Sequence, residues 1–372
     1  MRLVTDKGTL LRALQHVTGV VERKSTIPIL SNVLITAEAD GLRLRATDLD
    51  IEVVDTLQAE TRHAGGTTVS AHLLHDIVRK LPDAAQIELT RAAEDGRVTL
   101  TAGQAKFQLA ALPPDEFPDL GQSQMTHHFD IPATDLRKLI EKTRFAISSD
   151  DSRYYLHGIY LHTVDTPHGG KLRAVATDGH RLAQMDVPVP EGAKGMSGII
   201  VPRKTVAEAY KMIADSDGSV RVELSSSRIR FTAGHIVLTS KLIDGTFPDY
   251  ARVIPTSNDK VMTVANREFL GAVDRVSTLS SDKGRAVKLN LAAGKLTLSV
   301  NNPESGSAVE EISVGYSSPP LGIGFNARYL LDISAQFESE TLRFEFSDPS
   351  SPAVIRDAED TSALYVLMPM RV

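Results

Sequence analysis

The apolar residues of the chain recur with two periods, one typical of helices and one of strands. Largely apolar sets at three- and four-residue intervals fall on one helical face and predict helices near 7–20, 134–145 and 266–276. A second helix is predicted after each of these, near 70–81, 203–214 and 326–337. The sets that define the first three helices are Leu10, Leu11, Leu14 and Val17; Leu136, Leu139, Ile140 and Thr143; and Phe269, Leu270, Val273 and Val276.

Between the helices, apolar and polar residues alternate, as in a strand with one buried face. The alternation follows turn signals at Asp95-Gly96, Asp217-Gly218 and Ala293-Gly294. Strands with one apolar face suit antiparallel sheets that are covered on one side only. The predicted fold class is therefore α+β, with antiparallel sheets and two helices in each of three units.

Two landmarks show that the units are repeats of one another. Ala46-Thr47-Asp48-Leu49 corresponds to Ala176-Thr177-Asp178-Gly179, and Phe117-Pro118-Asp119 corresponds to Phe247-Pro248-Asp249, both at an offset of 130 positions. Two independent landmarks with one offset indicate an internal repeat rather than chance similarity. The predicted domains are 1–122, 128–253 and 254–372.

The positive charge of the chain is concentrated on the predicted helices. The whole chain has a formal charge of −6, yet the first four helices in chain order are each net positive and the last two are neutral. Basic helices on an acidic protein can attract phosphates to one surface, although charged runs are more often solvated helix faces. No helix has the features of a base reader, so contact with phosphates alone is expected.

Helix size limits how such a surface could enclose duplex DNA. Six packed helices in a circle, about 8–10 Å apart, leave a hole of only about 9 Å. Twelve helices leave roughly 28 Å, which admits a duplex about 20 Å wide. Two copies of the chain are therefore expected to form a ring around DNA.

The composition favours a cytoplasmic protein. The chain has no cysteine, so disulfides and thiolate metal sites are excluded and a reducing compartment fits best. Charge appears at Arg2, Asp6 and Lys7, too early for a signal peptide. No apolar run approaches the roughly 18 residues of a membrane span. We expect cytoplasmic location with the nucleoid, no membrane partner and no cofactor.

The whole chain resembles the bacterial β sliding clamp, the processivity subunit of DNA polymerase III. This resemblance implies a ring of two subunits, head to tail, with helices lining the pore. It also implies a non-enzymatic protein that encircles double-stranded DNA without sequence preference and tethers the replicative polymerase. The motifs that carry the resemblance are Thr26-Ile27-Pro28-Ile29-Leu30 with Asn32, Arg153-Tyr154-Tyr155-Leu156, Val175-Ala176-Thr177-Asp178-Gly179-His180-Arg181-Leu182, Phe247-Pro248-Asp249-Tyr250, Gly324-Phe325-Asn326 and Met368-Pro369-Met370-Arg371.

The resemblance further implies a cleft between domains 2 and 3 that binds short apolar peptides of the polymerase, the clamp loader and other partners. Leucine, valine and methionine suit an adaptable apolar pocket, but the same residues could simply close the core between two domains. Ser350 departs from the family, in which an aliphatic residue is common at this position. The matching cleft positions are Leu156, Thr177, Gly179, His180, Arg181, Leu182, Pro248, Arg252, Val253, Asn326, Tyr329, Val366, Leu367, Met368, Pro369, Met370 and Arg371.

Two further sets of residues follow from the resemblance and from the charge pattern. The subunit interface is expected at Phe107 and Leu109 on one edge and at Thr278 and Leu279 on the other, although Phe107 and Leu109 could equally be ordinary strand residues. Any single basic residue could instead face a neighbouring acid. The expected DNA-facing residues are Arg23, Lys24, Lys7, Arg12, Lys80, Arg137, Lys142, Arg153, Tyr154, Tyr155, Arg203, Lys204 and Lys211.

The catalytic alternatives are weaker. A metal-free hydrolase could use Asp178 and His180, but an acid and a histidine near a turn are far more often structural. His72 and His75 have a metal-like spacing without a third ligand, so no metal site is expected. Ser280-Ser281-Asp282-Lys283 fits a Ser-x-x-Lys pattern that is short enough to arise by chance.

Overall fold

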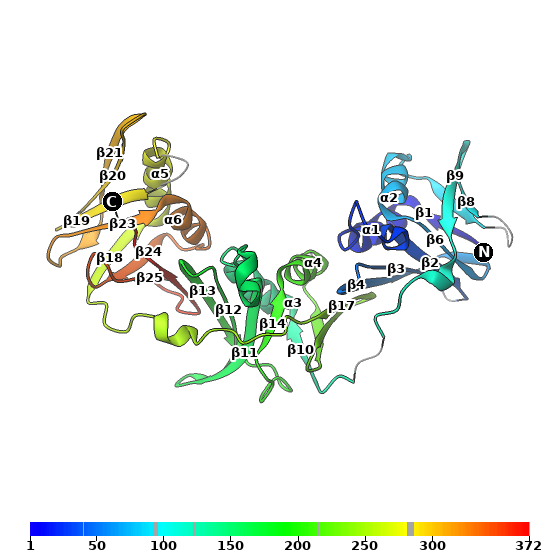
Figure 1. Cartoon of the computed structure of the whole chain (residues 1–372), viewed down its shortest axis with the longest axis horizontal. Helices are drawn as coiled ribbons and strands as arrows, with labels where there is room; N and C mark the ends of the chain where they lie inside the picture. The colour runs from blue at the N-terminus through cyan, green and yellow to red at the C-terminus, as the bar shows by residue number, and fades with distance from the viewer. Residues whose placement is uncertain (40, 92–95, 122–123, 215, 281–285, 372) are drawn as a thin grey trace. The chain divides into compact units, whose positions relative to one another are not determined.

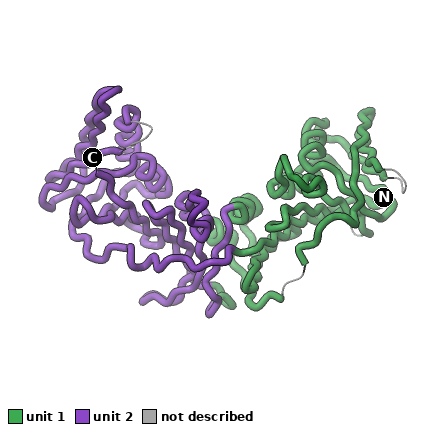
Figure 2. The backbone as a smooth tube through the Cα atoms, in the orientation of Figure 1, with its two compact units in different colours: residues 1–137, 190–193, 204–242 green, residues 138–189, 194–203, 243–372 purple. Residues whose placement is uncertain are grey.

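The computed structural model describes residues 1–39, 41–91, 96–121, 124–214, 216–280 and 286–371 (Figure 1). The chain divides into two compact units, which Figure 2 shows in different colours. Unit 1 comprises residues 1–137, 190–193 and 204–242, and unit 2 comprises residues 138–189, 194–203 and 243–372. We describe each unit by itself.

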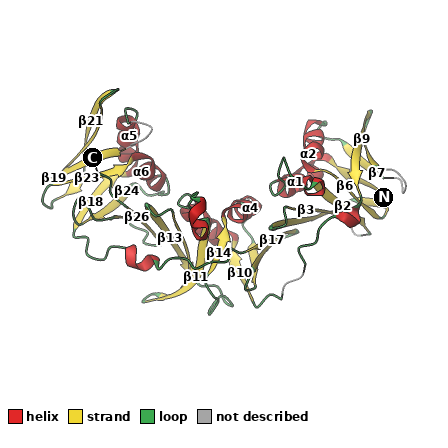
Figure 3. Cartoon of the chain, viewed as in Figure 1, coloured by secondary structure: helices red, strands yellow, loops and turns green. Residues whose placement is uncertain are grey.

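The described residues form six α-helices, which are red in Figure 3 together with the short 3₁₀ turns. All six helices were predicted, the first of each repeat from its apolar periodicity and the second from its place in the repeat, and their ends differ from the prediction by a few residues, as expected where end turns fray. None of the helices in the described part of the chain is long and apolar enough to span a bilayer. The helices are α1 (Lys7–Thr18), α2 (Ala71–Lys80), α3 (Ala133–Arg144), α4 (Arg203–Ile213), α5 (Asn266–Ser277) and α6 (Ala327–Ser334).

Unit 1 is built on one antiparallel sheet of thirteen strands, in the order β10-β15-β16-β17-β4-β3-β2-β6-β9-β8-β7-β1-β5. Helices α1 and α2 pack against each other and against this sheet. The strands are β1 (Arg2–Asp6), β2 (Asn32–Glu38), β3 (Gly41–Thr47), β4 (Ile51–Leu57), β5 (Glu60–His63), β6 (Gly65–Ser70), β7 (Gln86–Thr90), β8 (Arg97–Ala102), β9 (Ala105–Leu112), β10 (His127–Pro132), β15 (Ser219–Leu224), β16 (Arg228–Ala233) and β17 (Ile236–Lys241).

Unit 2 contains a nine-stranded sheet, in the order β14-β11-β12-β13-β26-β25-β24-β18-β22, and a four-stranded sheet, β21-β20-β19-β23. Helices α5 and α6 pack together, and α5 lies against β20 and β21. The strands are β11 (Gly158–Thr166), β12 (Gly169–Thr177), β13 (Arg181–Pro188), β14 (Ile199–Pro202), β18 (Lys260–Ala265), β19 (Ala286–Ala292), β20 (Lys295–Asn302), β21 (Gly306–Ser313), β22 (Gly315–Tyr316), β23 (Leu321–Asn326), β24 (Thr341–Phe346), β25 (Ala353–Asp357) and β26 (Ala363–Leu367).

The apolar faces read from the sequence form the cores of these units. Leu10, Leu14 and Val17 on α1 are fully buried, and so are Phe269 and Val273 on α5. Each fully buried side chain of this size contributes about 1.5–3 kcal/mol relative to an exposed one. The helices are therefore held mainly by packing on the sheets, as expected for helices of this length.

Two strand pairs join segments that the sequence assigned to different domains. In unit 1, β17 pairs with β4, for example Leu238 with Val53. In unit 2, β13 pairs with β26, for example Leu182 with Val366. Because both pairs cross the predicted boundaries, the middle segment contributes strands to both compact units, and the boundaries at 122, 128 and 253 stay a prediction.

Candidate functional site

A pocket of about 290 Å³ lies on unit 2 beside the strand pair β13–β26. Its walls come from the turn η3 (Asp151–Leu156), the corner between β12 and β13, the turn η4 (Tyr250–Val253) with the residues before it, and the end of β26. The lining residues are Arg153, Tyr155, Leu156, Thr177, Gly179, His180, Arg181, Leu182, Pro248, Asp249, Tyr250, Val253, Val366 and Met368.

The corner between β12 and β13 is fixed by its own side chains. The Thr177 hydroxyl donates to the Arg181 carbonyl (2.7 Å), and Asp178 Oδ1 accepts the backbone N–H groups of His180 (2.9 Å) and Arg181 (3.0 Å). Gly179 has a φ of +88°, and a Cβ there would lie 2.5 Å from Arg153 Nη1. Glycine is therefore favoured here both by the backbone conformation and by the close approach of Arg153.

The floor of the pocket is a buried apolar cluster. Leu156, Leu182 and Val366 are at most 3% exposed, and Phe247 and Tyr250 are 8% exposed. By contrast, Met368 at the rim is 41% exposed. A flexible, exposed methionine above a rigid apolar floor suits an adaptable binding surface for an apolar ligand.

Arg181 holds one wall of the pocket in place. Its guanidinium donates to Asp332 Oδ2 on α6 (2.6 Å), to the Phe145 carbonyl (2.7 Å) and to Asp178 Oδ2 (3.2 Å). It also lies 4.3 Å from the centroid of the Tyr329 ring, a cation–π contact. Because its donors are used in this way and its side chain is only 10% exposed, Arg181 braces the wall rather than offering a free charge to a ligand.

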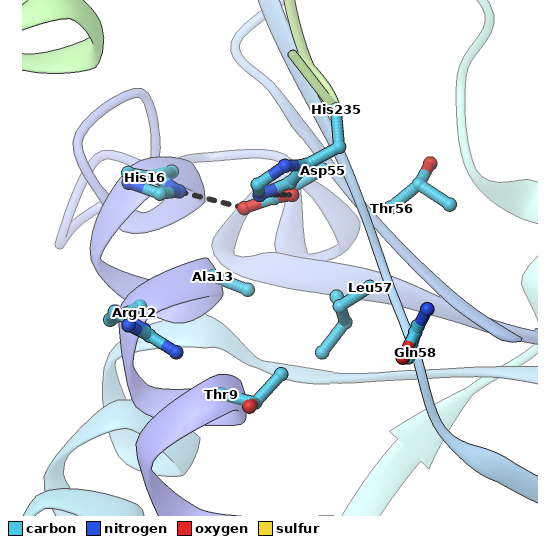
Figure 4. Close-up of a pocket in the computed structure, with 9 residues that line it drawn as sticks. All are labelled: Thr9, Arg12, Ala13, His16, Asp55, Thr56, Leu57, Gln58 and His235. Atoms are coloured by element: carbon cyan, nitrogen blue, oxygen red, sulfur yellow. Dashed lines mark hydrogen bonds and ion pairs between the residues drawn. The ribbon is translucent and has the colours of Figure 1, made fainter. Parts of the chain in front are cut away.

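A second and more polar pocket, of about 560 Å³, lies on unit 1 between α1 and β4 (Figure 4). His16 and His235 both point toward the fully buried carboxylate of Asp55. His16 Nδ1 lies 2.7 Å from Oδ2, at hydrogen-bond distance. His235 Nε2 lies 3.4 Å from Oδ1, an ion-pair distance, but in the described residues no hydrogen bond reaches Oδ1. Arg12 also lines this pocket.

Comparison with known families places the chain. Domain models of the DNA polymerase III beta subunit match along its length: the N-terminal domain at residues 1–121, the central domain at 130–249 and the C-terminal domain at 251–371. The chain belongs to the DNA polymerase III beta subunit family. The resemblance inferred from the motifs is thereby confirmed, and so is the fold class, an α+β clamp fold of three repeated domains with two helices each.

Individual relatives match the chain over its full length. The beta sliding clamp of Caulobacter vibrioides is 49% identical over 372 residues, and that of Escherichia coli is 38% identical over 373 residues, each with 100% of both chains covered. Among solved structures, a sliding clamp from Bartonella birtlesii bound to griselimycin has a TM-score of 0.97 at 50% identity and covers 100% of both chains. A sliding clamp from Caulobacter crescentus has a TM-score of 0.95 at 48% identity, with the same coverage. These matches support a sliding clamp and not the hydrolase alternative.

The pocket of this clamp-family chain brings together ten of the seventeen predicted cleft residues. Of the other seven, Leu367 is fully buried in β26 and is not among the residues that line this pocket. Asn326 caps α6 by accepting the Arg328 N–H (3.0 Å), and Tyr329 lies beneath Arg181. The remaining four are Arg252, which is paired with Asp249 (2.7 Å), and Pro369, Met370 and Arg371, which follow the rim residue Met368. A role of these seventeen residues in peptide binding stays a prediction.

The pocket also includes four residues that the cleft prediction omitted. Arg153 and Tyr155 were assigned to the DNA-facing set, whereas here they line the pocket. Asp249 and Tyr250 were quoted within the Phe247-Pro248-Asp249-Tyr250 motif but were not assigned to the cleft. Their position next to Pro248 in that repeated corner was the available signal.

Several predicted DNA-facing residues of the family fold are occupied by internal contacts. The expectation that Lys7 faces DNA is corrected by the structure, because its side chain is buried. Its ammonium donates to the Leu81 carbonyl (2.5 Å) and to Asp83 (2.8 Å), two partners more than 70 positions away. Arg137 donates to the carbonyls of Ile213 (2.9 Å) and Ser216 (2.7 Å). Lys7 is thus buried and not presented to a phosphate, whereas Arg137 is half-buried and its predicted role at DNA stays a prediction.

The other cations fall into two groups. Arg23, Lys24, Lys80 and Arg12 are exposed, as is Tyr154, at 55%. The remaining basic side chains each have an internal partner, and their predicted role at DNA stays a prediction. They are Lys142 with Glu338 (3.2 Å), Arg153 with Asp150 (2.8 Å), Arg203 with the Ile147 carbonyl (3.0 Å), Lys204 with Asp48, and Lys211 with Glu208 (2.7 Å).

The predicted subunit-interface residues lie at or near two sheet edges. Phe107 and Leu109 are on β9, whose described residues 105–110 pair only with β8. Leu109 is 6% exposed, so its side chain packs in the core of its own unit. Thr278 and Leu279 follow α5, next to the end of β20, where Asn302 Nδ2 donates to the Leu279 carbonyl (3.1 Å).

The structure gives ordinary roles to the catalytic alternatives. Asp178 uses its carboxylate on the backbone of its own corner and on Arg181, while the His180 ring lies over Tyr329 at 6.5 Å. His72 Nε2 is 2.9 Å from the Val21 carbonyl, and no group of three or more acidic or histidine residues in the described ranges could hold a metal ion. Of the Ser-x-x-Lys pattern, 281–283 lie outside the described residues.

Proposed function

We propose that the chain is a DNA sliding clamp. Two copies close head to tail into a ring around duplex DNA, and the unit 2 pocket tethers the replicative polymerase and other partners through short apolar peptides. The observation that carries this proposal is the full-length match to solved sliding clamps, with a TM-score of 0.97 at 50% identity. The clamp has no catalytic site of its own and works in the cytoplasm with the nucleoid.

The two free sheet edges support head-to-tail closure. The edge of β9 in the N-terminal domain and that of β21 in the C-terminal domain have unpaired backbone groups in the described residues, and such edges can pair with another chain. β21 is an edge strand that pairs with β20 on one side only, and its Val309 is 69% exposed, a large apolar exposure for such an edge. β21 also carries Glu311, while β9 carries the exposed Lys106, so the two edges are electrostatically compatible.

The pocket supports the tethering role by its chemistry. Its floor is apolar and buried, its rim carries Met368 and Val253, and its walls are braced by Arg181. A relative of 50% identity has been solved with griselimycin bound, and this compound is a suitable probe for the pocket.

A retention experiment tests the ring. We expect a native mass near twice 40.3 kDa, long retention on closed circular DNA, and rapid loss once the circle is cut. Val309→Lys should yield monomers and abolish retention, whereas Val309→Thr, which keeps the shape of the side chain, should retain the dimer. A persistent wild-type monomer, or equal retention on cut and closed DNA, would refute topological enclosure.

A further inference from the structure

A ladder of polar side chains crosses three strands next to the pocket. His162 on β11 lies opposite Arg173 on β12, and Arg173 lies opposite Asp186 on β13. Arg173 forms a bidentate pair with Asp186, with Nε–Oδ1 and Nη2–Oδ2 distances of 2.6 and 2.7 Å. The hydroxyl of Tyr250 lies on this ladder, 2.9 Å from His162 Nε2 and 3.3 Å from Arg173 Nη1. Of these residues, only Tyr250 lines the pocket.

His162 supports both ends of the segment that forms one pocket wall. Its ring stacks on Tyr160 (4.5 Å between centroids), and Tyr160 stacks on Phe247 (4.9 Å, interplanar angle 5°). Through its Nε2, His162 also contacts Tyr250, which lies three residues after Phe247. The residues after Phe247 supply Pro248, Asp249 and Tyr250 to the pocket. The imidazole therefore lies behind the wall and fixes its two aromatic ends.

Hydrogen-bond donors and acceptors determine the protonation state that this arrangement requires. A guanidinium can only donate, so the Tyr250 oxygen accepts from Arg173. The hydroxyl proton of Tyr250 is then available to His162 Nε2, and in this arrangement Nε2 is the acceptor and carries no proton. If His162 gained a proton, Nε2 would become a donor, the Tyr250 proton would lose its acceptor, and a second cation would face Arg173.

The surroundings of His162 keep the ring neutral. Burial and the neighbouring Arg173 cation lower the pKa of His162 below its ordinary value of 6.5, outweighing the Thr163 backbone and the Asp186 carboxylate, which raise it. The titratable groups that face the ring are thus Arg173 from β12, Asp186 from β13 and Tyr250 from η4, with Tyr160 stacked on its own strand. Protonation of His162 is therefore disfavoured while the ring keeps these contacts, and it becomes favourable only when the wall loosens.

We propose that His162, in its neutral form, is a positioning residue for the Phe247–Tyr250 wall, so that the pocket binds apolar ligands less tightly when this imidazole gains a proton. The inference rests on the proposed function of the pocket. It adds a specific pH dependence that originates outside the lining residues.

Calorimetric titration with griselimycin, from about pH 8 to about pH 4.5, tests the proposal on the full-length protein, because the lowered pKa of His162 places its protonation below the ordinary range. We expect the wild-type affinity to fall about 3- to 10-fold over this range, corresponding to the loss of one hydrogen bond. In His162→Gln, whose amide oxygen can accept from Tyr250 but does not titrate, this part of the pH dependence should disappear. In His162→Phe, which keeps the ring stack but has no acceptor, the affinity should be lower at all pH values and should no longer depend on His162.

Two controls separate His162 from other imidazoles. His180 lies in the pocket itself, so the comparison is repeated in a His180→Gln background to remove its contribution. His168 is exposed on the β11–β12 turn, and His168→Gln should leave the pH profile unchanged. Tyr250→Phe provides a second route should the His162 variants fold poorly, since removing the hydroxyl should also remove the pH dependence.

The outcomes separate this inference from the function on which it rests. A pH profile that persists in His162→Gln and disappears with His180→Gln would overturn the role of His162 and leave the pocket intact. If Leu182→Glu on the pocket floor does not change griselimycin affinity at about pH 8, the ligand binds elsewhere and the pocket assignment itself fails. Circular dichroism of each variant confirms that the fold is retained.

Discussion

The strand pair β4–β17 of unit 1 and the strand pair β13–β26 of unit 2 are built alike, yet they present different surfaces. Each lies next to a corner with the same hydrogen bonds. Asp48 Oδ1 accepts the N–H groups of the second and third following residues, at 2.9 and 2.8 Å, as Asp178 does in the second corner. The hydroxyl of Thr47 likewise donates to the Ile51 carbonyl (2.9 Å). The backbone repeat is therefore conserved at the level of single contacts.

We call each of these strand pairs, together with its corner, a joint. The side chains around the two corners decide what each joint can bind. In unit 1 the corner carboxylate pairs with Lys204, Asp50 pairs with Lys241 (2.9 Å), and Asp55 is enclosed by two histidines. In unit 2 one arginine, Arg181, pairs with both nearby carboxylates, and the pocket floor beside it is apolar. A fold repeated in one chain can thus offer a charged joint at one position and an apolar pocket at another. The following changes test this contrast, from the largest expected effect to the smallest.

Arg181→Ala should affect the unit 2 joint most strongly. It leaves the largely buried Asp178 without its cation, leaves Asp332 with only the more distant Arg328 (3.9 Å), and removes the stacking on Tyr329, so we expect a loss of about 2–4 kcal/mol in the free energy of unfolding. Griselimycin affinity should fall with it, because the wall loses its brace. Urea unfolding and calorimetry measure both effects.

The matched change in the other joint is Lys204→Ala. Its side chain is 38% exposed, so the ion pair with Asp48 should contribute less than about 1 kcal/mol. Arg181→Lys is a further control. A single ammonium cannot reproduce contacts with two carboxylates and a carbonyl together, so this variant should not recover the stability that Arg181→Ala loses. Equal losses for Arg181→Ala and Lys204→Ala would contradict the view that only the unit 2 joint depends on a buried cation.

Asp55→Ala should have the next largest effect and should act on unit 1 alone. The carboxylate is fully buried, so its removal leaves His16 without its hydrogen-bond partner, takes the neighbouring charge from His235 and opens space behind them. We expect a loss of about 1–3 kcal/mol, measured by urea unfolding. Griselimycin affinity should be unchanged, and a marked loss of affinity would argue against the assignment of that ligand to the unit 2 pocket.

The sequence predicted the helices and the repeat well, because both depend on local period and spacing. Leu10 and Phe269 mark buried helical faces whatever the rest of the chain does. Lys7 shows where such reasoning stops, since its partners Leu81 and Asp83 are brought to it only by the tertiary fold. The cleft was predicted in outline from family motifs, but the bracing role of Arg181 depends on Asp332, which lies 151 positions away.

A reciprocal exchange at the two corners tests how far their backbones are equivalent. Leu49 has a φ of +81° and Gly179 a φ of +88°, so a side chain is tolerated in one corner and absent from the other. Gly179→Ala should destabilise by about 1–2 kcal/mol, the usual cost of this conformation, and should displace Arg153 in the pocket. Leu49→Gly should change the free energy of unfolding by less than about 1 kcal/mol, because relief of strain offsets the extra freedom of the unfolded chain.

A neutral effect of Gly179→Ala in urea unfolding would show that the second corner is no more constrained than the first. A loss of griselimycin affinity without a loss of stability would instead indicate that Arg153 and the space above Gly179 matter chiefly for the ligand. The matched control is Gly234→Ala. Gly234 also has a positive φ, +58°, but a Cβ there would meet no atom within 4 Å, so this change isolates the backbone cost from the contact.

The smallest effect is expected at Ser350, where the resemblance led us to expect an aliphatic residue. Here the Ser350 hydroxyl donates to Asp348 Oδ1 (2.6 Å), and its backbone N–H donates to the same oxygen (2.8 Å). The hydroxyls of Ser350 and Ser351, together with the backbone N–H groups of the same two residues, lower the pKa of Asp348 to about 2. Because the folded-state pKa lies below the ordinary 3.8, the contribution to stability is present above pH 3.8 and is lost as the pH falls toward 2. Ser350→Ala should therefore raise the pKa of Asp348 toward 3.8 in an NMR titration of its carboxyl carbon. A pKa that stays near 2 would mean that the Ser350 hydroxyl contributes little to the Asp348 site, and that Ser351 and the backbone N–H groups suffice to hold the carboxylate.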